Sequence, residues 1–214
     1  MESISSSSIA DKSVLMTSFP LMEHFYTIQG EGYNTGVPAY FLRLGGCDLG
    51  CVWCDVKDSW DASAHPVVSV EEMIGFVKAA KAEHVVVTGG EPLMYNLDHL
   101  CEQFRASGIK LFLETSGAYP LTGKWDWICV SPKKFKAPLT EVLKHADELK
   151  AIVYNQSDFG FAEQYANSIK KECKLFLQPE YSAYNKMIPS IVDYVKQHPK
   201  WRISLQTHKF MNIP

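Results

Sequence analysis

The sequence has few of the features that mark membrane-bound or nucleic-acid-binding proteins. Its 214 residues contain no apolar run that approaches the roughly 20 residues of a membrane-spanning helix. Its 21 Lys and Arg are outnumbered by 24 Asp and Glu, so there is no basic excess for binding phosphates. We therefore expect neither a membrane nor a nucleic acid among its partners.

The N-terminal segment also lacks the marks of a secretory signal. Met1–Thr17 has neither a basic start nor a continuous apolar stretch of about 7–15 residues. We therefore expect a cytoplasmic protein. Residues 1–18 are interpreted as a flexible tail, because Ser5–Ser8 offer nothing to bury, and residues 19–214 as a single domain.

Strand-like and helix-like segments alternate along the rest of the chain. Strands are expected at residues 40–44, 84–88, 110–114, 127–130, 148–153, 174–177 and 202–205. Helices are expected after a capping box at Ser69 and Glu72, around 97–104, between 158 and 172, and around 188–195. This alternation predicts an α/β fold with a mostly parallel sheet. Because connections such as 116–124 are too short and broken for a helix, we predict a single-domain, incomplete TIM-like barrel with a curved sheet.

Glycine and polar residues gather where the expected strands end. The segments are Gly45-Gly46-Cys47, Gly89-Gly90-Glu91-Pro92, Thr115-Ser116-Gly117, Ser131-Pro132-Lys133 and Gln178-Pro179. In parallel α/β folds the loops that follow the strands carry the chemistry. We therefore predict a functional site at this edge of the sheet.

Three of the six cysteines form a C-x-x-x-C-x-x-C pattern on one short loop, at Cys47, Cys51 and Cys54. A structural zinc site needs four protein ligands, and His65 is the only histidine close in sequence. A 4Fe–4S cluster held by three cysteines leaves one iron open for another ligand. Reduced thiols or a zinc site with three cysteines and one histidine remain as alternatives. Cys101 and Cys129 lie on apolar stripes and are expected in the core, and Cys173 is given no function.

The cysteine pattern, with Trp53 as the aromatic residue before Cys54, resembles the cluster loop of radical S-adenosylmethionine (SAM) enzymes. The resemblance implies a 4Fe–4S cluster whose open iron chelates SAM and whose electron cleaves it to start radical chemistry. Gly89-Gly90-Glu91-Pro92 resembles the segment of that family whose backbone meets the amino group of SAM. Glycines suit a place where backbone approaches a ligand closely.

From Phe25 to Pro214 the chain is similar to the 7-carboxy-7-deazaguanine synthase family. The similar segments are Q-G-E-G at 29–32, R-L-G-G-C at 43–47, T-G-G-E-P at 88–92, E-T-S-G at 114–117 and S-P-K at 131–133. The resemblance implies conversion of 6-carboxy-5,6,7,8-tetrahydropterin to 7-carboxy-7-deazaguanine with release of ammonia, in the pathway to queuosine and other deazapurines. SAM would be regenerated in each turnover.

The resemblance also assigns residues to three groups. The cluster ligands would be Cys47, Cys51 and Cys54. The substrate contacts would be Ile28, Gln29, Gly30, Glu31, Arg43, Thr88, His208 and the terminal carboxylate of Pro214. The SAM contacts would be Trp53, Cys54, Asp55, Gly90, Glu91, Ser116, Ser131, Pro132, Lys133, Gln178, Pro179, Glu180 and Tyr181.

Arg43 also stands out without the resemblance, because it lies in an otherwise apolar strand and buried arginine is rare without a partner. Its guanidinium suits bidentate binding of a carboxylate, with a structural ion pair as the alternative. Gln29 and Glu31 would supply acceptors to the donor-rich edge of the pterin, with a solvated turn as their alternative.

One position departs from the family pattern. The residue after Cys54-Asp55 is Val56, where the family has a hydroxyl residue that helps to hold Mg²⁺. Valine offers no oxygen to this hard cation. A bound Mg²⁺ would therefore be held by substrate and water, or with help from Asp55 or Asp58. Alternatively, Mg²⁺ is absent, and Lys57 supplies the positive charge in its place.

The resemblance further implies a homodimer and a flavodoxin or ferredoxin as electron donor. Two other functions stay open at this point. One is a radical SAM activase that acts on a partner protein, and the other is a zinc-binding module without catalysis.

Overall fold

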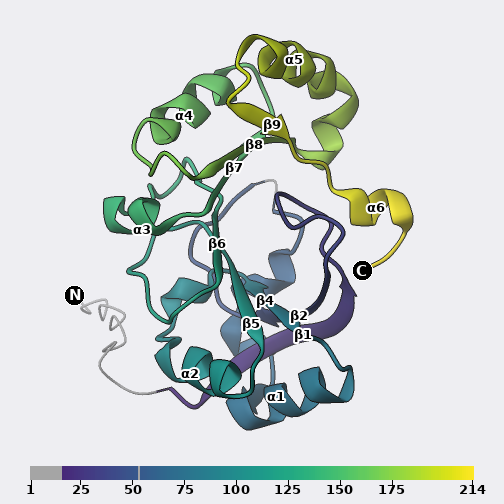
Figure 1. Ribbon diagram of the computed structural model, residues 1–214, viewed down its shortest axis with the longest axis vertical. Coiled ribbons are helices and arrows are strands. Elements are labelled where there is room, and N and C mark those ends of the chain that lie inside the picture. Colours follow the sequence, from purple (N-terminus) through teal and green to yellow (C-terminus); the bar gives the residue numbers. More distant parts are fainter. Residues whose placement is uncertain (1–15, 53) are drawn as a thin grey trace, which may run out of the picture.

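The computed structural model describes residues 16–52 and 54–214, which form one nine-stranded sheet with helices along its outer side (Figure 1). The strands are β1 (Ser18–Ile28), β2 (Pro38–Leu44), β3 (Val67–Ser69), β4 (His84–Gly89), β5 (Lys110–Thr115), β6 (Trp127–Val130), β7 (Glu148–Val153), β8 (Lys174–Pro179) and β9 (Trp201–Ile203). The α-helices are α1 (Val70–Ala79), α2 (Asp98–Ala106), α3 (Thr140–His145), α4 (Ser157–Ala166), α5 (Tyr184–Gln197) and α6 (Thr207–Met211). Short 3₁₀ turns are η1 (Lys57–Trp60), η2 (Ala62–Ala64), η3 (Pro92–Met94) and η4 (Tyr181–Ala183).

The sheet has the order β3-β1-β2-β4-β5-β6-β7-β8-β9. From β2 through β9 every neighbouring pair is parallel, whereas β1 pairs antiparallel with both β2 and β3. Within the described residues the two edge strands, β3 and β9, do not pair with each other, so the curved sheet stays open. The predicted incomplete α/β barrel with a mostly parallel sheet is confirmed.

The N-terminal strand β1 is missing from the sequence-based prediction, which placed residues 25–32 before the first strand. Glu23 and His24 interrupt its apolar pattern, and each of them interacts with a residue on the neighbouring strand β2. Glu23 pairs with Arg43, and the Nδ1 atom of His24 lies 2.6 Å from the hydroxyl of Tyr40 on β2. Most of the expected tail over residues 1–18 lies outside the described residues. Within it, Met16 contacts the core and Ser18 begins β1.

The helices agree with the sequence in part. The capping box at Ser69 and Glu72 is present at the start of α1. The helix expected between residues 158 and 172 ends early, because α4 stops at Ala166. The sequence analysis did not predict the short helices α3 and α6, which have too few turns to produce a periodic apolar stripe. No helix in the described part of the chain has the length and apolar character needed to cross a membrane.

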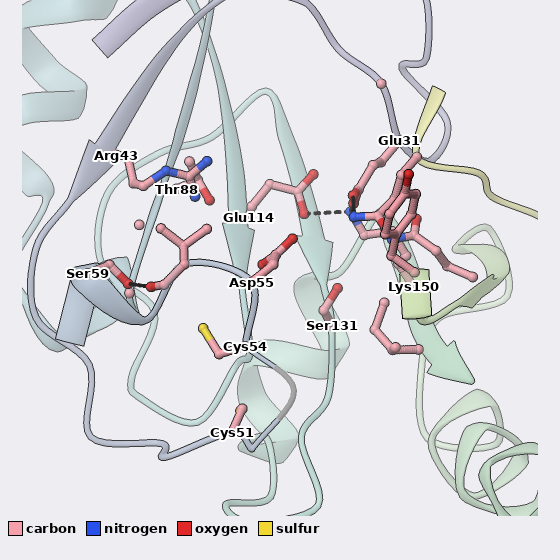
Figure 2. A pocket seen from close by; sticks show the side chains of 18 of the residues that line it. Glu31, Arg43, Cys51, Cys54, Asp55, Ser59, Thr88, Glu114, Ser131 and Lys150 are labelled. Atoms are coloured by element: carbon pink, nitrogen blue, oxygen red, sulfur yellow. Dashed lines mark hydrogen bonds and ion pairs between the residues drawn. The ribbon is translucent and has the colours of Figure 1, made fainter. Parts of the chain in front are cut away.

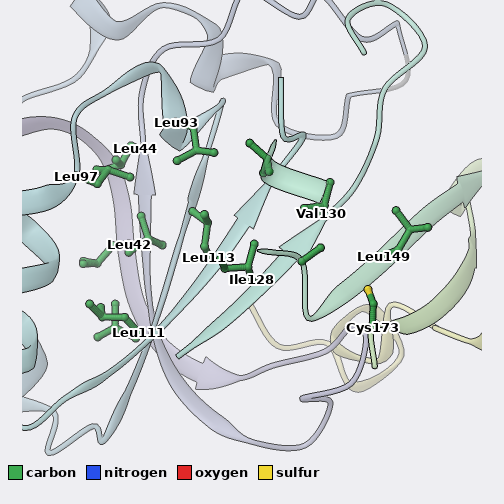
Figure 3. Close-up of a cluster of buried hydrophobic side chains, with 14 of the residues drawn as sticks. Leu42, Leu44, Leu93, Leu97, Leu111, Leu113, Ile128, Val130, Leu149 and Cys173 are labelled. Carbon is green, nitrogen blue, oxygen red and sulfur yellow. The ribbon is translucent and has the colours of Figure 1, made fainter. Parts of the chain in front are cut away.

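The core lies between the sheet and the helices on its outer side (Figure 3). Strand residues such as Leu42, Leu111 and Leu149 are fully buried in it. Cys101 and Cys129 are 1% exposed and Cys173 is 7% exposed, so all three are buried; Cys101 and Cys173 belong to the main apolar cluster. Burial raises the pKa of Cys101 and Cys173 to about 12 and raises that of Cys129 as well. These thiols stay protonated and act as small apolar side chains.

Candidate active site

One cavity of about 520 Å³ opens where the parallel strands end. This volume is within the usual range for small-molecule sites. Most of the predicted site residues line it. They are Ile28, Gln29, Gly30, Glu31, Arg43, Cys47, Cys51, Cys54, Asp55, Thr88, Gly90, Glu91, Ser116, Ser131, Lys133, Gln178, Pro179, Glu180, Tyr181, His208 and Pro214. The topology thus brings together in one cavity residues that lie in widely separated segments of the sequence.

A few predicted residues are placed elsewhere. Pro132 lines a second cavity of about 130 Å³ instead of the main one. Trp53 lies outside the described residues, and nothing can be said of its side chain. Asp58 and Lys57, which were considered near the Mg²⁺ position, are not among the lining residues. Lys57 instead lies over the ring of Trp60, with its nitrogen 6.0 Å from the ring centre.

The three clustered cysteines all line the cavity, and Figure 2 shows Cys51 and Cys54 at one end of it. Cys51 packs with Leu49 and Ala118 in a small apolar cluster that Cys47 and Cys54 also contact. Burial raises the pKa of Cys47 to about 11 and raises that of Cys51. Since a metal-binding cysteine must be a thiolate, loading this loop would release protons. Within residues 16–52 and 54–214, no three His, Cys, Asp or Glu side chains converge on a single metal ion, whereas a 4Fe–4S cluster takes each of its cysteines on a different iron.

The Gly89-Gly90-Glu91-Pro92 segment supports the cysteine loop from behind. A Cβ atom at Gly90 would lie 2.3 Å from the carbonyl oxygen of Gly46 and 2.6 Å from the Cβ of Cys47. The backbone N–H of Glu91 donates to Gly46 at 3.0 Å, and that of Gly90 donates to Leu44 at 3.0 Å. Glycine is therefore required here by the close approach of the cysteine loop, in addition to any ligand.

The carboxylate of Glu91 is used inside the protein. It is 1% exposed and accepts hydrogen bonds from the backbone of Leu93 (3.0 Å), the hydroxyl of Thr115 (2.5 Å), and the backbone (2.8 Å) and hydroxyl of Ser116. Glu91 thereby fixes the E-T-S-G turn to the cysteine loop. Any contact of Glu91 with SAM would have to use its backbone.

The side chains of Arg43 and Thr88 lie next to each other along the wall of the cavity, because these residues are paired in the β2–β4 register. The Nε of Arg43 donates to Glu23 at 2.5 Å, so the ion pair considered as an alternative is formed. That contact uses one edge of the guanidinium, and among the described residues no other hydrogen bond to Arg43 is present. The arginine is therefore anchored by its ion pair while its Nη groups remain available to the cavity, and its binding of a substrate carboxylate stays a prediction.

The opposite end of the cavity carries a buried group of charges, of which only Glu31 was predicted from the sequence. Lys150 on β7 has a side chain only 4% exposed, and its Nζ donates to Glu31 at 2.6 Å and to Glu114 at 3.0 Å. Gln206 donates to the second oxygen of Glu31 at 2.9 Å, and Gln29 lies 3.5 Å from Glu114. Figure 2 shows a dashed line from Glu114 to Lys150 and places Glu31 beside Lys150, away from Cys51.

The charges of this group are strongly perturbed. Burial alone would raise the pKa of Glu31, but the charge and hydrogen bond of Lys150, with donors from Gln206 and Gln178, lower it to about 2. Burial also opposes the charge of Lys150, yet its neighbours Cys129, Glu114 and Glu31 raise its pKa well above the usual value. Both groups are therefore ionised at neutral pH.

Glu148 lies behind this group and outside the cavity lining. Its carboxylate accepts hydrogen bonds from the backbone of Tyr33 and the indole of Trp127, both at 3.1 Å. A Cβ at Gly32 would lie 1.9 Å from Glu148 Oε1, which explains a glycine at this position. Burial raises the pKa of Glu148 to about 7, with Lys150 opposing the shift and Glu114 adding to it.

The C-terminal segment closes the side of the cavity near Gln29–Glu31. The backbone and hydroxyl of Thr207 donate to Gly30 at 2.9 and 3.0 Å, and a Cβ at Gly30 would lie 2.3 Å from Nδ1 of His208. Burial lowers the pKa of His208, so this histidine is neutral at pH 7. The hydroxyl of Thr27 donates to a main-chain carboxylate oxygen of Pro214 at 3.2 Å, which places Pro214 against the end of β1.

The remaining predicted SAM contacts form the wall near β8. Gln178 is 2% exposed and accepts from the hydroxyl of Ser204 at 2.6 Å. Glu180 caps η4 through the backbone of Ala183 at 3.1 Å. Lys209 lies over the ring of Tyr181 at 4.3 Å and reaches Asp55 at 3.4 Å. These contacts join the C-terminal helix α6 to the segment that follows the cysteines.

Comparison with known proteins identifies the family. Residues 42–130 match the radical SAM superfamily. The 7-carboxy-7-deazaguanine synthase of Flavobacterium psychrophilum is 55% identical over 91% of this chain and 92% of the relative. The enzyme of that name from Synechocystis is 45% identical over 94% and 96% of the two chains.

The chain belongs to the 7-carboxy-7-deazaguanine synthase family. The crystal structure of QueE from Escherichia coli superimposes on it with a TM-score of 0.79 and 30% identity, covering 88% of this chain and 93% of that one. Family membership makes the chain a radical SAM enzyme of deazapurine biosynthesis and implies a 4Fe–4S cluster and SAM. This membership argues against the two alternative functions, a zinc-binding module without catalysis and a radical SAM activase.

Several residues of the site were not predicted from the sequence. They are Glu114, Glu148, Lys150, Gln206 and Lys209. A signal was present for two of them, because Glu148 and Lys150 are charged residues in an otherwise apolar strand, the same feature that marked Arg43. Because Glu148 and Lys150 are two residues apart in the strand, both side chains lie on the same face of β7.

Proposed function

We propose that this enzyme converts 6-carboxy-5,6,7,8-tetrahydropterin to 7-carboxy-7-deazaguanine and releases ammonia, with SAM as a regenerated cofactor. One observation supports this most directly: a single cavity has three cysteines at one end, a buried acceptor group at the other, and an anchored arginine on its wall. A donor-rich heterocycle that carries a carboxylate matches this distribution of charge.

In this proposal Cys47, Cys51 and Cys54 hold the cluster in the apolar cup formed with Leu49 and Ala118. When bound, the cluster and SAM supply the electron and the radical that start the reaction. The chain itself positions and shields these groups. The backbone of Gly90 and Glu91 keeps the cysteine loop in place, and the walls at Ser131, Lys133 and Gln178–Tyr181 surround the space beside it.

The substrate would lie with its amino-pyrimidine edge on Gln29, Glu31 and Glu114, which supply acceptors. Its carboxylate would meet the Nη groups of Arg43, with Thr88 beside them. His208, neutral at pH 7, can act as donor or acceptor over the ring, and Pro214 lies beside it in the lining. Ile28 and Gly30 would complete this wall through their backbone.

The proposal also covers the finer features of the family. A flavodoxin or ferredoxin would supply the electron, and the enzyme would be a cytoplasmic homodimer. A bound Mg²⁺ would depend on substrate and water oxygens, because Val56 lines the cavity without an oxygen in its side chain.

The direct test is turnover under strictly anaerobic conditions. Reconstituted enzyme should convert 6-carboxytetrahydropterin to 7-carboxy-7-deazaguanine when SAM and a reductant are present, and should release one ammonia for each product. Omitting SAM or the reductant should abolish product. An enzyme that holds its cluster and cleaves SAM, yet makes no deazaguanine from this substrate, would contradict the proposal.

A further inference from the structure

Lys150 is the centre of the charged end of the cavity. Its side chain is 4% exposed and it extends from the middle of β7. It donates to Glu31, which follows β1, and to Glu114 on β5. These three segments are far apart in the sequence, and the sheet order separates β5 from β7 by one strand. A single ammonium therefore links two carboxylates that come from different parts of the fold.

Both carboxylates need this link to stay where they are. Two ionised carboxylates close together in a poorly solvated site repel each other, and one of them would take up a proton or turn away if the lysine were absent. Lys150 occupies one oxygen of each carboxylate, Oε2 of Glu31 and Oε2 of Glu114. Among the described residues, the Oε1 atoms meet neutral amides, Gln206 at 2.9 Å from Glu31 and Gln29 at 3.5 Å from Glu114. Two further neutral groups also interact with the carboxylates, Gln178 with Glu31 and the thiol of Cys129 with Glu114. Each carboxylate oxygen can accept more than one hydrogen bond, so acceptor capacity remains toward the cavity.

We propose that Lys150 is the positioning residue of the substrate end: it holds Glu31 and Glu114 as a fixed, ionised pair of acceptors for the N–H donors of the substrate. This inference rests on the proposed function. Two carboxylates and one lysine leave an excess negative charge at this end of the cavity. The pair should thus favour a donor-rich heterocyclic edge and disfavour an analogue that presents acceptors there.

Glu148 makes the inference testable without a change in buried charge. It interacts with Lys150 and Glu114 but does not line the cavity. A Lys150→Met variant removes the ammonium and keeps a side chain of similar length. When assayed at about pH 8, above the raised pKa of Glu148, the double variant Lys150→Met with Glu148→Gln removes one positive and one negative group from the same buried region. It protects folding while leaving Glu31 and Glu114 unlinked.

The experiment uses the reconstituted holoenzyme with SAM and 6-carboxytetrahydropterin, and measures kcat, KM and iron content for each variant. The matched control is Lys170→Met, which breaks a more exposed ion pair between Lys170 and Asp147 next to β7. We expect KM to rise on the order of tenfold or more in both Lys150 variants, with kcat changed much less and iron content unchanged. Lys170→Met should keep both constants.

The other outcomes separate the possible failures. If wild-type enzyme makes no product from the pterin, the proposed function fails before Lys150 is tested. If wild-type enzyme turns over and Lys150→Met keeps its KM, the positioning role is wrong while the function stands. If the double variant restores the KM that Lys150→Met loses, Lys150 only balances buried charge, and the inference is overturned.

Discussion

The two ends of the cavity are built in different ways. The cysteine end comes from one short loop, Cys47–Cys54, and a second loop behind it holds its backbone through Gly90 and Glu91. The charged end is assembled from the turn after β1, from β5, from β7 and from the segment before α6, which supply Glu31, Glu114, Lys150 and Gln206. The first end depends on local backbone geometry, and the second depends on the tertiary fold.

This difference predicts how each end responds to mutation. A ligand loop fails when one ligand is lost, because the remaining ligands no longer enclose the bound group. A network of buried charges fails in steps, since its members have several partners and share protons. Changes at the cysteine end should therefore abolish the chemistry, whereas changes at the charged end should alter affinity and pH dependence.

The largest effect is expected for Cys51→Ala. Loss of one thiolate leaves the cluster without one of its three anchors, so both iron content and SAM cleavage should be abolished. Anaerobic reconstitution followed by iron analysis and visible absorption measures the first, and release of methionine measures the second. Cys173→Ala is the matched control, because Cys173 is buried outside the cavity. Product formed at the wild-type rate by Cys51→Ala would refute the assignment of this loop.

The same contrast explains what the sequence could predict. The cysteine loop could be identified because its ligands are neighbours in the chain and their spacing carries the information. The alternation of strands and helices likewise predicts the parallel sheet, and the polar strand ends predict the edge where the cavity lies. The antiparallel strand β1 was missed because Glu23 and His24 break its apolar pattern, and their partners lie on β2.

The charged end could not be predicted in the same way. Lys150 and Glu148 could have been singled out as charges in an apolar strand, but their partners follow only from the strand order. Glu114 lies in the E-T-S-G segment, whose resemblance to the family drew attention to Ser116 instead. The structure shows that Ser116 is bound to Glu91, while Glu114 reaches the cavity.

Arg43→Lys should have the next largest effect. It tests the wall of the cavity separately from the cysteine end and the charged end. Lysine can keep the ion pair with Glu23 but loses the guanidinium fork that faces the cavity. We expect a loss of about 1–3 kcal/mol in substrate binding, seen as a higher KM, with SAM cleavage little affected. Glu23→Gln is the control, since it removes the ion pair and keeps the fork. An equal loss in both variants would give Arg43 a structural role only.

A smaller effect is expected in the pH dependence of folding. Burial raises the pKa of Glu148 from 4.5 to about 7, so the folded state keeps a proton that the unfolded chain loses. Stability from this group is complete below about pH 4.5 and is lost as pH rises through 7, by on the order of 3 kcal/mol. Glu31 has the opposite sign, because its pKa is lowered to about 2 and its contribution is lost as pH falls below 4.5.

Urea unfolding of the protein between pH 5 and 8 measures how the free energy of unfolding changes with pH. Wild-type protein should lose stability across the range, and Glu148→Gln should flatten the loss because the glutamine cannot ionise. A slope that survives in Glu148→Gln would assign the titration to another group. This comparison tests the charged end alone, since neither variant changes the cysteine loop.

The smallest effect is expected from adding Mg²⁺, because Val56 stands where the family has a hydroxyl residue. Val56 lines the cavity but carries no oxygen. The neighbouring oxygens are already used: the hydroxyl of Ser59 donates to the carbonyl of Val56 at 2.7 Å, and Asp55 meets Lys209 at 3.4 Å. Adding Mg²⁺ to chelator-treated enzyme should therefore change the rate by less than about twofold. Val56→Thr restores a hydroxyl at this position and should make the rate respond to Mg²⁺. A large saturable response of the wild-type enzyme would contradict the prediction and show that substrate and water oxygens alone can hold the cation.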